Sequence, residues 1–268
     1  MSELRVFTLF SGSGGNCTYI KAGEVELLID AGVCEREIAA SLSSLGTSLD
    51  NISHIFITHD HTDHTRGLEI ICKKHSPAVH ITEGSARVSV NPDKTPHLCE
   101  RAVVHPLVYT VKLGDVTVAS FATPHDSAAS VGYTIEYMGY KIGFATDIGH
   151  VTDTVRSNLL GSNAVVLEFN HDVEMLTDGP YPDFLKRRIL SDKGHLSNDD
   201  AACLAAELAE NGTDRFVLAH LSEQNNIPEL AFASALSALG DIDRRGIRIG
   251  VAEVNTPTVL VNFHRRDK

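Results

Sequence analysis

The chain has 268 residues, of which 43% are hydrophobic and 22% are charged, and its formal net charge is -12. This length can bury a large core, so we expect one globular domain spanning residues 1–268. The acidic balance excludes a protein that coats nucleic acid by general charge, because that mode needs many Lys and Arg residues. No apolar run of about 18 residues and no signal-like N-terminus occurs, which predicts a soluble, cytoplasmic protein that does not contact a membrane.

Short runs rich in Val, Ile, Thr and Phe predict strands along the whole chain. They fall at about 4–10, 17–20, 25–32, 54–58, 78–82, 116–124, 131–137, 140–147, 163–169, 215–221, 247–253 and 258–263. Helices are expected at about 35–45, 64–75, 151–160, 197–211 and 228–239. A hairpin is expected at Met138-Gly139, which makes the sheets mixed. The pattern predicts an α/β fold of the αββα sandwich type, with two packed mixed β-sheets and helices on both outer faces.

The segment HIFITHDHTDH places His59, His61, Asp63 and His64 directly after an apolar strand. Three histidines at fixed offsets beside an aspartate are improbable in an ordinary solvated loop, which is the alternative. Imidazole and carboxylate ligands suit zinc, manganese or iron better than calcium or magnesium. Four ligands so close in sequence do not converge easily on one tetrahedral ion. The spacing therefore suits two ions, one bound by His59 and His61 and the other by Asp63 and His64.

A pair of divalent ions points to hydrolysis. Two such ions about 3.5–4 Å apart lower the pKa of a shared water and bind both oxygens of a displacement at phosphorus. The same arrangement also serves the hydrolysis of a thioester or a lactone, so the spacing alone predicts only a hydrolase.

The segment THDHTDH resembles the H-x-H-x-D-H signature of the metallo-β-lactamase superfamily, whose fold is the αββα sandwich. Three later segments resemble the remaining metal motifs in the expected order. The resemblance implies His125 in ATPHDSAASVGYTI as a ligand of the first metal, Asp147 in GFATDIG as a bridging ligand, and His220 in FVLAHLS on the second metal. Antibiotic-hydrolysing members typically lack a histidine after the aspartate of the signature, so His64 argues against β-lactam hydrolysis.

The segment GHLSNDDAACLAAE resembles the H-S-T motif of the RNase Z branch, in which a histidine near the metals assists departure of the leaving oxygen. By this resemblance His195 is the candidate general acid, and Glu168 in VVLEFN is the carboxylate that orients it. The alternatives are that His195 only neighbours a helix cap and that Glu168 is a solvated strand end. Together with Asp63 of the metal signature, these are the candidate catalytic residues.

Longer segments resemble the WalJ (YycJ) family over nearly the whole chain. They are LFSGSGGN, HDHTDHTRGL, EFNHDVEML, YPDFLKRRILSDKGHLSNDDAA and LAHLSEQNN. This resemblance implies a metal-dependent nuclease with 5′-to-3′ exonuclease action on DNA, associated with a cell-wall-sensing two-component system. Phe169 departs from the ESNHD pattern of that family, where a small polar residue is expected, which argues against a direct role for this position in the site.

A basic stretch precedes the candidate acid in this otherwise acidic chain. Lys186, Arg187, Arg188 and Lys193 are expected to hold the phosphates of a DNA strand without reading its bases. The alternative is a basic helix face that forms ordinary salt bridges with surplus Asp and Glu. Because the net charge repels nucleic acid at long range, we expect salt-sensitive binding confined to this stretch.

The glycine-rich segment SGSGGN precedes a strand, so neither a P-loop nor a dinucleotide-binding fingerprint fits. It is either a tight turn or a loop whose backbone amides contact a substrate phosphate. In the second interpretation, Ser11 and Asn16 are its polar participants.

The leading hypothesis is a dinuclear metal-dependent phosphodiesterase, a 5′-to-3′ exonuclease on DNA, in which hydroxide formed at the metals attacks phosphorus. Two divalent ions are expected, zinc or manganese, with iron as a further candidate. The first rival is a small-molecule hydrolase acting on a lactone, a thioester or a cyclic phosphodiester, which would tolerate loss of the basic stretch. The second rival is a non-catalytic regulator of the two-component system, which would keep its effect when Asp63 or Asp147 is changed.

Overall fold

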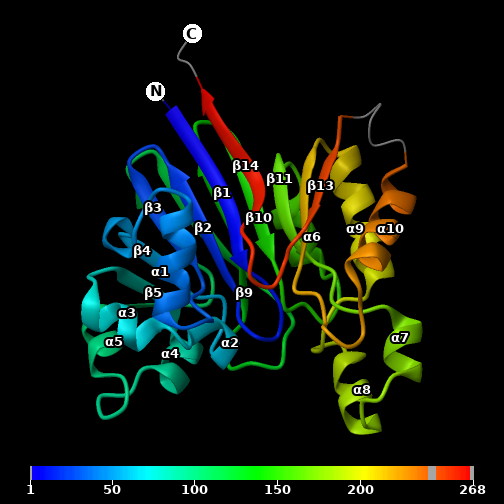
Figure 1. Ribbon diagram of the computed structural model, residues 1–268, viewed down its shortest axis with the longest axis horizontal. Coiled ribbons are helices and arrows are strands. Elements are labelled where there is room, and N and C mark those ends of the chain that lie inside the picture. Colours follow the sequence, from blue (N-terminus) through cyan, green and yellow to red (C-terminus); the bar gives the residue numbers. More distant parts are fainter. Residues whose placement is uncertain (1, 241–245, 266–268) are drawn as a thin grey trace. The chain divides into compact units, whose positions relative to one another are not determined.

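The protein is represented by a computed structural model that describes residues 2–240 and 246–265. Within these residues the chain forms two seven-stranded sheets and ten α-helices (Figure 1). The chain divides into two compact units. Unit 1 comprises Met1–Tyr109, Ser127–Val131 and Glu253–Lys268, and unit 2 comprises Thr110–Asp126 and Gly132–Ala252. Each unit contains one of the two sheets.

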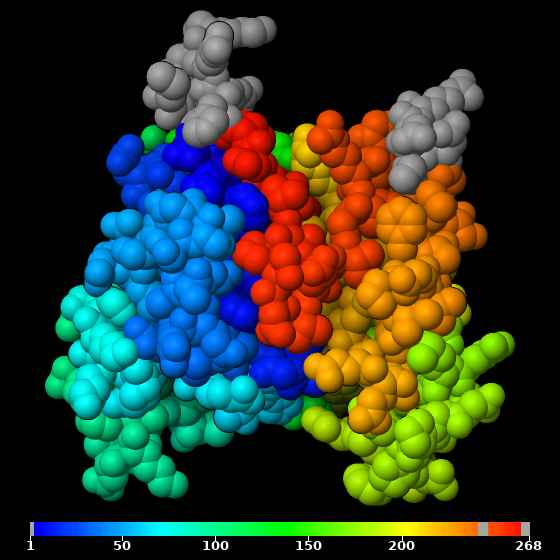
Figure 2. Space-filling view, in the orientation of Figure 1, coloured from blue at the N-terminus to red at the C-terminus, as the bar shows by residue number. Residues whose placement is uncertain are grey.

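The sheet of unit 1 has the strand order β14-β1-β2-β3-β4-β5-β6. Its strands are β1 (Ser2–Phe10), β2 (Cys17–Ala22), β3 (Val25–Ile29), β4 (His54–Phe56), β5 (Ala78–Thr82), β6 (Ala102–His105) and β14 (Thr258–Arg265). Pairing is antiparallel from β14 to β3 and parallel from β3 to β6. Figure 2 shows β14, in red, beside β1, in blue, at the surface. The sheet is therefore mixed, as expected.

Helices cover one face of this sheet. They are α1 (Glu35–Ser44), α2 (Thr62–Thr65), α3 (Leu68–Lys74), α4 (Glu83–Ser89) and α5 (Pro96–Arg101), with the 3-10 helix η1 (Leu49–Asn51). Phe7 and Leu9, two residues apart on β1, share a buried cluster with Ile38 of α1 and Ile71 of α3. Because alternate residues of a strand point to the same face, this cluster identifies the face that packs on the helices.

The sheet of unit 2 has the strand order β13-β12-β11-β10-β9-β8-β7. Its strands are β7 (Thr110–Leu113), β8 (Val116–Ala122), β9 (Val131–Tyr137), β10 (Tyr140–Ala145), β11 (Ala164–Glu168), β12 (Arg215–Ala219) and β13 (Arg248–Val251). The hairpin between β9 and β10 turns at Met138 and Gly139, whose φ angles are 50° and 76°. Strands β10 to β13 are parallel. The predicted hairpin is confirmed.

Five helices accompany the second sheet. They are α6 (Asp153–Leu159), α7 (Val173–Asp178), α8 (Asp183–Ile189), α9 (Asn198–Glu210) and α10 (Pro228–Leu239). Leu204 of α9 and Ala235 of α10 share a buried cluster with Val165 of β11. The hydroxyl of Ser197 accepts a hydrogen bond from the backbone N–H of Asp200 over 3.2 Å, so the predicted cap of α9 is confirmed.

The prediction of two mixed sheets with covering helices is confirmed, whereas several short elements were missed. Strands β6 and β7 are half exposed, so they lack the apolar alternation of the buried strands. Helices α4, α5 and α7 have only six or seven residues, too few for a clear helical period. Among the described residues the longest helix is α9, with 13 residues, and no helix has the length and apolarity needed to cross a membrane. That the chain folds as one domain stays a prediction.

Candidate metal centre

Both units place polar residues at the carboxyl ends of their parallel strands. In unit 1, Asp30 follows β3 and His59 follows β4. In unit 2, Asp147 follows β10, Glu168 ends β11 and His220 follows β12. Because the carboxyl ends of neighbouring parallel strands meet at one edge of a sheet, side chains distant in sequence come together there.

Three of these residues have a left-handed backbone conformation. The φ angles are 61° at Asp30, 58° at Asp147 and 58° at His220. Among the described residues the only other non-glycine with positive φ is Met138, in the β9–β10 hairpin. Such conformations cost roughly 1–3 kcal/mol each and are concentrated at functional sites. The strained turns at these strand ends therefore mark a candidate functional site in each unit.

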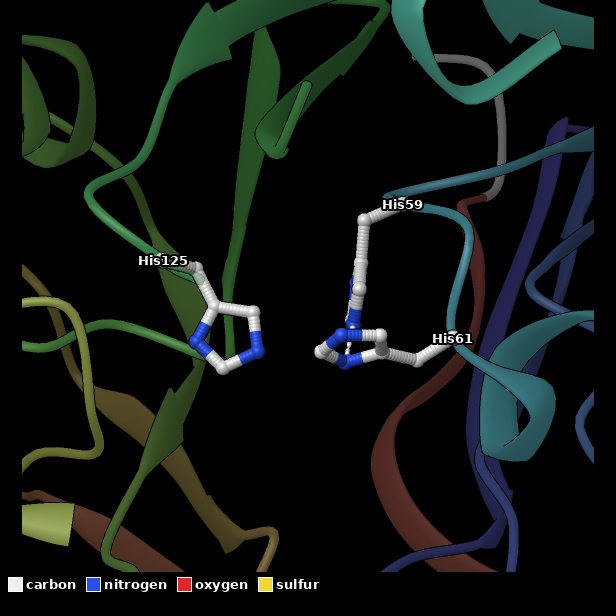
Figure 3. A group of neighbouring side chains, drawn as sticks. All are labelled: His59, His61 and His125. Atoms are coloured by element: carbon white, nitrogen blue, oxygen red, sulfur yellow. Dashed lines mark hydrogen bonds between the residues drawn. The ribbon is translucent and has the colours of Figure 1, made fainter. Parts of the chain in front are cut away.

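The predicted ligands of unit 1 form two neighbouring pairs. The Nε2 atom of His59 lies 3.0 Å from the Nδ1 atom of His61, and Figure 3 shows these two rings in contact. The Nε2 atom of His64 lies 3.4 Å from a carboxylate oxygen of Asp63. His59 and His64 are fully buried, whereas 23% of the Asp63 side chain is exposed. The two pairs are the ones that the sequence spacing predicts for two ions.

Asp30 and Thr58 hold the opposite nitrogens of two of these rings. The Nδ1 atom of His64 donates to Asp30 over 2.7 Å, and Asp30 also accepts from the backbone N–H and the hydroxyl of Thr58, both over 2.8 Å. The Thr58 hydroxyl also lies 3.1 Å from Nδ1 of His59. An anchored Nδ1 atom leaves Nε2 to bind a metal, an arrangement typical of metal-binding histidines. Asp30 was not among the residues expected from the sequence, where its one signal is a carboxylate directly after a buried strand.

The glycine-rich loop, residues 11–16, packs against the metal loop, which is the segment of residues 59–64. The Asn16 side chain is 8% exposed, exchanges hydrogen bonds of 3.0 Å with both backbone groups of Gly12, and has its Nδ2 atom 3.1 Å from Nε2 of His64. Ser11 is 5% exposed. These contacts favour the interpretation of the loop as a tight turn.

Gly32 permits this close packing. A β-carbon at this position would lie 1.6 Å from the carbonyl oxygen of Asp63. The same carbonyl accepts the backbone N–H of Asn16 over 2.8 Å, and the N–H of Gly32 donates to the carbonyl of Asn16 over 2.8 Å. Any side chain at Gly32 would therefore displace the metal loop.

Glu168 is the centre of the polar network in unit 2. One carboxylate oxygen accepts from the Nδ1 atoms of His195, over 2.8 Å, and His220, over 3.0 Å. The other oxygen accepts from the backbone N–H groups of Ile148, over 2.7 Å, and Leu196, over 3.3 Å. Glu168 is 0% exposed, so the alternative of a solvated strand end is wrong.

The Glu168 carboxylate stays ionised and orients two rings. Burial alone would raise the pKa of Glu168, but the charges and hydrogen bonds of His195 and His220 outweigh it and lower the pKa to about 2. Both imidazoles are held at Nδ1, which leaves their Nε2 atoms for other chemistry. His220 is buried, whereas 18% of the His195 side chain is exposed. His195 therefore remains accessible to a substrate.

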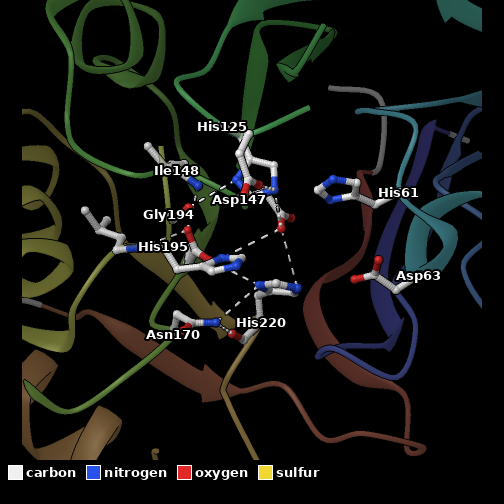
Figure 4. Close-up of polar contacts among 12 residues, drawn as sticks. His61, Asp63, His125, Asp147, Ile148, Asn170, Gly194, His195 and His220 are labelled. Atoms are coloured by element: carbon white, nitrogen blue, oxygen red, sulfur yellow. Dashed lines mark hydrogen bonds and ion pairs between the residues drawn. The ribbon is translucent and has the colours of Figure 1, made fainter. Parts of the chain in front are cut away.

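Asp147 lies among the histidines of unit 2 at distances that suit metal ligands (Figure 4). Its Oδ1 atom is 3.6 Å from Nε2 of His125 and 3.6 Å from Nε2 of His220. Two ligands about 2.1 Å from one tetrahedral ion lie about 3.4 Å apart, whereas hydrogen bonds are shorter than these contacts. The Nδ1 atom of His125 donates to the carbonyl of Gly194 over 3.1 Å. Burial lowers the pKa of His125, which favours the neutral ring that binds metals.

The donor sets of both units fit a divalent cation by their chemistry. Within unit 2, Asp147, Glu168, His195 and His220 each offer an atom, and these atoms all lie within 4.8 Å of one another. Unit 1 adds the imidazoles of His59 and His64, each with a partner at Nδ1, together with the carboxylate of Asp63. Imidazole nitrogen with carboxylate oxygen is the donor set of zinc, manganese and iron sites.

Asn226 links the loop that follows β11 to the start of α9, and both lie beside the polar residues of unit 2. Its Nδ2 atom donates to the carbonyls of Phe169, over 2.9 Å, and Asn170, over 3.1 Å. Its amide also exchanges hydrogen bonds of 2.9 and 3.0 Å with the amide of Asn198. Asn170 in turn donates to the carbonyl of His220 over 2.9 Å. These buried hydrogen bonds were not expected from the sequence. Phe169 takes part in them through its backbone carbonyl, while its ring lies in the core.

The basic stretch divides into engaged and free cations. Lys186 donates to a backbone carbonyl of α7 over 2.6 Å, and Arg188 forms a short hydrogen-bonded ion pair with Asp126. Arg187 and Lys193 are exposed, and their side chains make no hydrogen bond or ion pair with any described residue. The salt-bridge alternative therefore holds for Arg188, while Arg187 and Lys193 are available to phosphates.

Comparisons with known proteins agree over most of the chain. The model of the β-lactamase superfamily domain matches residues 26–221. The exodeoxyribonuclease YycJ of Bacillus anthracis is 35% identical over 258 residues, which cover 93% of each chain. The exodeoxyribonuclease WalJ of Streptococcus pneumoniae is 32% identical over 246 residues, which cover 91% of each chain.

Comparison with solved structures finds proteins of similar fold. The short form of human tRNase Z has a TM-score of 0.65 at 18% identity, covering 96% of this chain and 99% of that chain. At this identity the likeness concerns the fold alone. The predicted metallo-β-lactamase fold is confirmed.

Proposed function

Because the chain belongs to the metallo-β-lactamase superfamily and, within it, to the WalJ (YycJ) family, it is a metal-dependent hydrolase, and we propose that its substrate is DNA. The proposed reaction is removal of nucleotides from a 5′ end by hydrolysis of a phosphodiester, at a site with two divalent ions. The name exodeoxyribonuclease of both relatives supports the substrate class.

The pairing of His195 with Glu168 is the observation that carries this proposal. Cleavage of a phosphodiester expels an alkoxide oxygen, which must take up a proton as it leaves. The Nδ1 atom of His195 is bound to Glu168 over 2.8 Å, so Nε2 is the atom that delivers the proton. A general acid contributes about 10²- to 10⁴-fold to such a step. Thioester hydrolysis expels a far weaker base and needs no acid of this kind.

The remaining candidate residues bind and orient in this proposal. Bound divalent ions would supply the nucleophile at neutral pH and neutralise charge on the phosphoryl oxygens. The proposed ligands are the residues expected from the sequence, with zinc or manganese as the ions: His59, His61, Asp63, His64, His125, Asp147 and His220. Asp30 and Glu168 hold the tautomers of the rings that they contact.

Arg187 and Lys193 are the proposed phosphate contacts, because their charges are exposed and unpaired among the described residues. Their role is to position the strand without reading its bases. Lys186 and Arg188 already have intramolecular partners, so they contribute less. These partners also favour the second candidate function, a small-molecule hydrolase of the same fold, because they leave fewer cations of the basic stretch available to phosphates.

The test compares substrates under matched conditions. Purified protein with Mn²⁺ or Zn²⁺ receives end-labelled duplex DNA with and without a 5′ phosphate, beside a lactone and a thioester. We expect stepwise shortening of the DNA from the 5′ end and its loss in the Asp63→Ala variant. Turnover of an ester with intact DNA in every metal would refute the nuclease proposal in favour of the small-molecule hydrolase. A biological effect that survives Asp63→Ala would support the non-catalytic regulator.

Two double variants with the same change of charge test the phosphate contacts. Arg187→Ala/Lys193→Ala should weaken DNA binding and reduce the slope of log affinity against log salt by about 2, one for each lost contact. Lys186→Ala/Arg188→Ala should change the slope less, since both side chains already have partners. Equal slopes in the two variants would contradict the assignment of free and engaged cations.

A further inference from the structure

Helix α8 carries an aromatic side chain that packing does not explain. Phe184 is 68% exposed, the largest exposed fraction of any large hydrophobic side chain in the described residues. All ten phenylalanines of the sequence lie in the described residues, and Phe184 is the only exposed one. The helix lies at the surface, in the yellow-green part of Figure 2. Because phenylalanine side chains are usually buried in the core, this exposed ring points to a role at the surface.

The exposed ring shares a helix face with a free cation. Phe184 and Arg187 are three residues apart in α8, a spacing that places side chains next to each other on one face. The opposite face is anchored by Ile189, which is 8% exposed. Arg187 makes no hydrogen bond or ion pair with any residue in the described ranges. The pair therefore presents a flat apolar ring beside an unneutralised guanidinium.

We propose that Phe184 and Arg187 bind an unpaired nucleotide of the DNA strand, with the base stacked on the ring and the phosphate on the guanidinium. This inference rests on the proposed function and names the form of DNA that the surface recognises. Aromatic side chains stack on any base, and basic groups follow the backbone, in proteins that bind single strands without sequence preference. A base inside a duplex has both faces covered by its neighbours, so only an unpaired or terminal base can stack here.

Charge and size favour a nucleotide over a protein partner. The segment of α8 carries Lys186, Arg187 and Arg188 against the single acid Asp183, in a chain with a net charge of -12. A stable protein interface covers about 800 Å² on each partner, far more than one seven-residue helix face offers. One nucleobase, in contrast, matches the area of one phenyl ring.

The absence of tryptophan from the sequence allows a direct probe of this surface. In the Phe184→Trp variant of the full-length, metal-loaded protein, the indole is the only one in the chain. The probe strand is a phosphorothioate oligothymidylate of about eight nucleotides, which resists hydrolysis and falls within the length range of single-strand sites. We expect saturable quenching by the single strand and much weaker quenching by a blunt duplex of the same length. Equal quenching by a polyglutamate peptide would overturn the proposal in favour of a protein-binding surface.

Substitutions separate stacking from simple apolar contact. Phe184→Ala should weaken single-strand binding about 5- to 150-fold, the range measured for loss of one stacked base. Phe184→Leu keeps an apolar side chain but cannot stack, so it should also weaken binding. Phe184→Tyr keeps an aromatic ring, so it should bind the single strand as the unmodified protein does. Val88→Ala, at another exposed apolar position, is the surface control and should bind as the unmodified protein does. Unchanged binding in Phe184→Ala, or full binding in Phe184→Leu, would overturn the stacking proposal.

The outcome is independent of whether DNA is cleaved. If the protein binds the single strand through Phe184 but hydrolyses no DNA, the stacking surface stands and the nuclease proposal fails. If it shortens DNA and Phe184→Ala binds and cuts overhangs as well as the unmodified protein does, the nuclease proposal stands and the stacking surface fails.

Discussion

The two units assemble their candidate metal donors in different ways. In unit 1 the four predicted donors lie within residues 59–64, one continuous segment that runs into helix α2, so their proximity follows from the short stretch of chain between them. In unit 2 the donors follow separate strands, with Asp147 after β10 and His220 after β12, and parallel pairing brings them to the same edge. A motif read along the sequence therefore describes the first set, whereas the second set exists only once the strands are in order.

Both units use a buried carboxylate at a strand end to orient imidazoles, but the carboxylates do not hold equal numbers of rings. Asp30 holds the Nδ1 atom of one ring, that of His64. Glu168 holds the Nδ1 atoms of two rings, those of His195 and His220. If orientation is what these carboxylates contribute, loss of Glu168 should matter more than loss of Asp30.

The largest effect is expected for Glu168→Gln. The amide replaces one carboxylate oxygen by an NH2 group, which cannot accept from the backbone N–H groups of Ile148 and Leu196. It also removes the negative charge that holds the two imidazole N–H groups, so both rings lose their orientation. We expect kcat/KM on DNA to fall about 100-fold, the upper range for loss of a residue that orients metal ligands. Steady-state kinetics with metal content as a second readout tests this, with Glu207→Gln as the matched control, because Glu207 is a partly exposed carboxylate in the same unit paired with Arg156. A loss below twofold would show that neither ring depends on Glu168.

A second effect contrasts the metal loop with a histidine cluster that contains no carboxylate. The rings of His54, His80 and His105 are hydrogen-bonded in series across β4, β5 and β6, over 3.0 and 2.9 Å. Burial first, and then the neighbouring His54 and His105, lower the pKa of His80 from 6.5 to about 3. Between about pH 3 and 6.5, His80 is therefore protonated in the unfolded chain but neutral in the folded protein. Acid should thus destabilise the fold through this cluster.

The sign follows from the direction of the pKa shift. The folded-state pKa lies below the unfolded value, so stability is lost as the pH falls below about 6.5 and continues to fall until about pH 3. For His80 alone we expect a loss of about 2 kcal/mol at pH 5 relative to pH 8. Urea unfolding at both pH values measures it. In His80→Phe, whose ring can stack on Phe56, the difference between the two pH values should be smaller. An equal difference in both proteins would assign the acid sensitivity to other groups.

The smallest effect is expected for Asp30→Asn. Asparagine tolerates the left-handed backbone at this position, whose φ is 61°, so the substitution removes the charge without straining the turn. Since Asp30 holds the ring of His64, whereas Glu168 holds two rings, we expect kcat/KM to fall about tenfold. Asp50→Asn is the control, because this exposed carboxylate of the same unit pairs with His75, which is not a predicted metal ligand. A loss in Asp30→Asn larger than that in Glu168→Gln would reverse the comparison of the two units.

The sequence by itself determined the features whose partners are close along the chain. The contact between the predicted ligands His59 and His61, the hairpin at Met138 and the cap at Ser197 all depend on residues within a few positions of one another. Their geometry follows from local backbone preferences and short separations. The contact between Glu168 and His195 was expected from the family resemblance, since composition and spacing contain no information about it.

Only the tertiary structure decided which polar groups meet across long stretches of chain. It brought Asp30 to His64, and it brought His220 to the same carboxylate as His195. It also paired Arg188 with Asp126 and left Arg187 without a partner among the described residues, although both residues are arginines of the same basic stretch. The physical reason is that strand order and helix orientation set these distances. Residue type fixes a charge or a donor, but the fold decides whether that group meets a partner or the solvent.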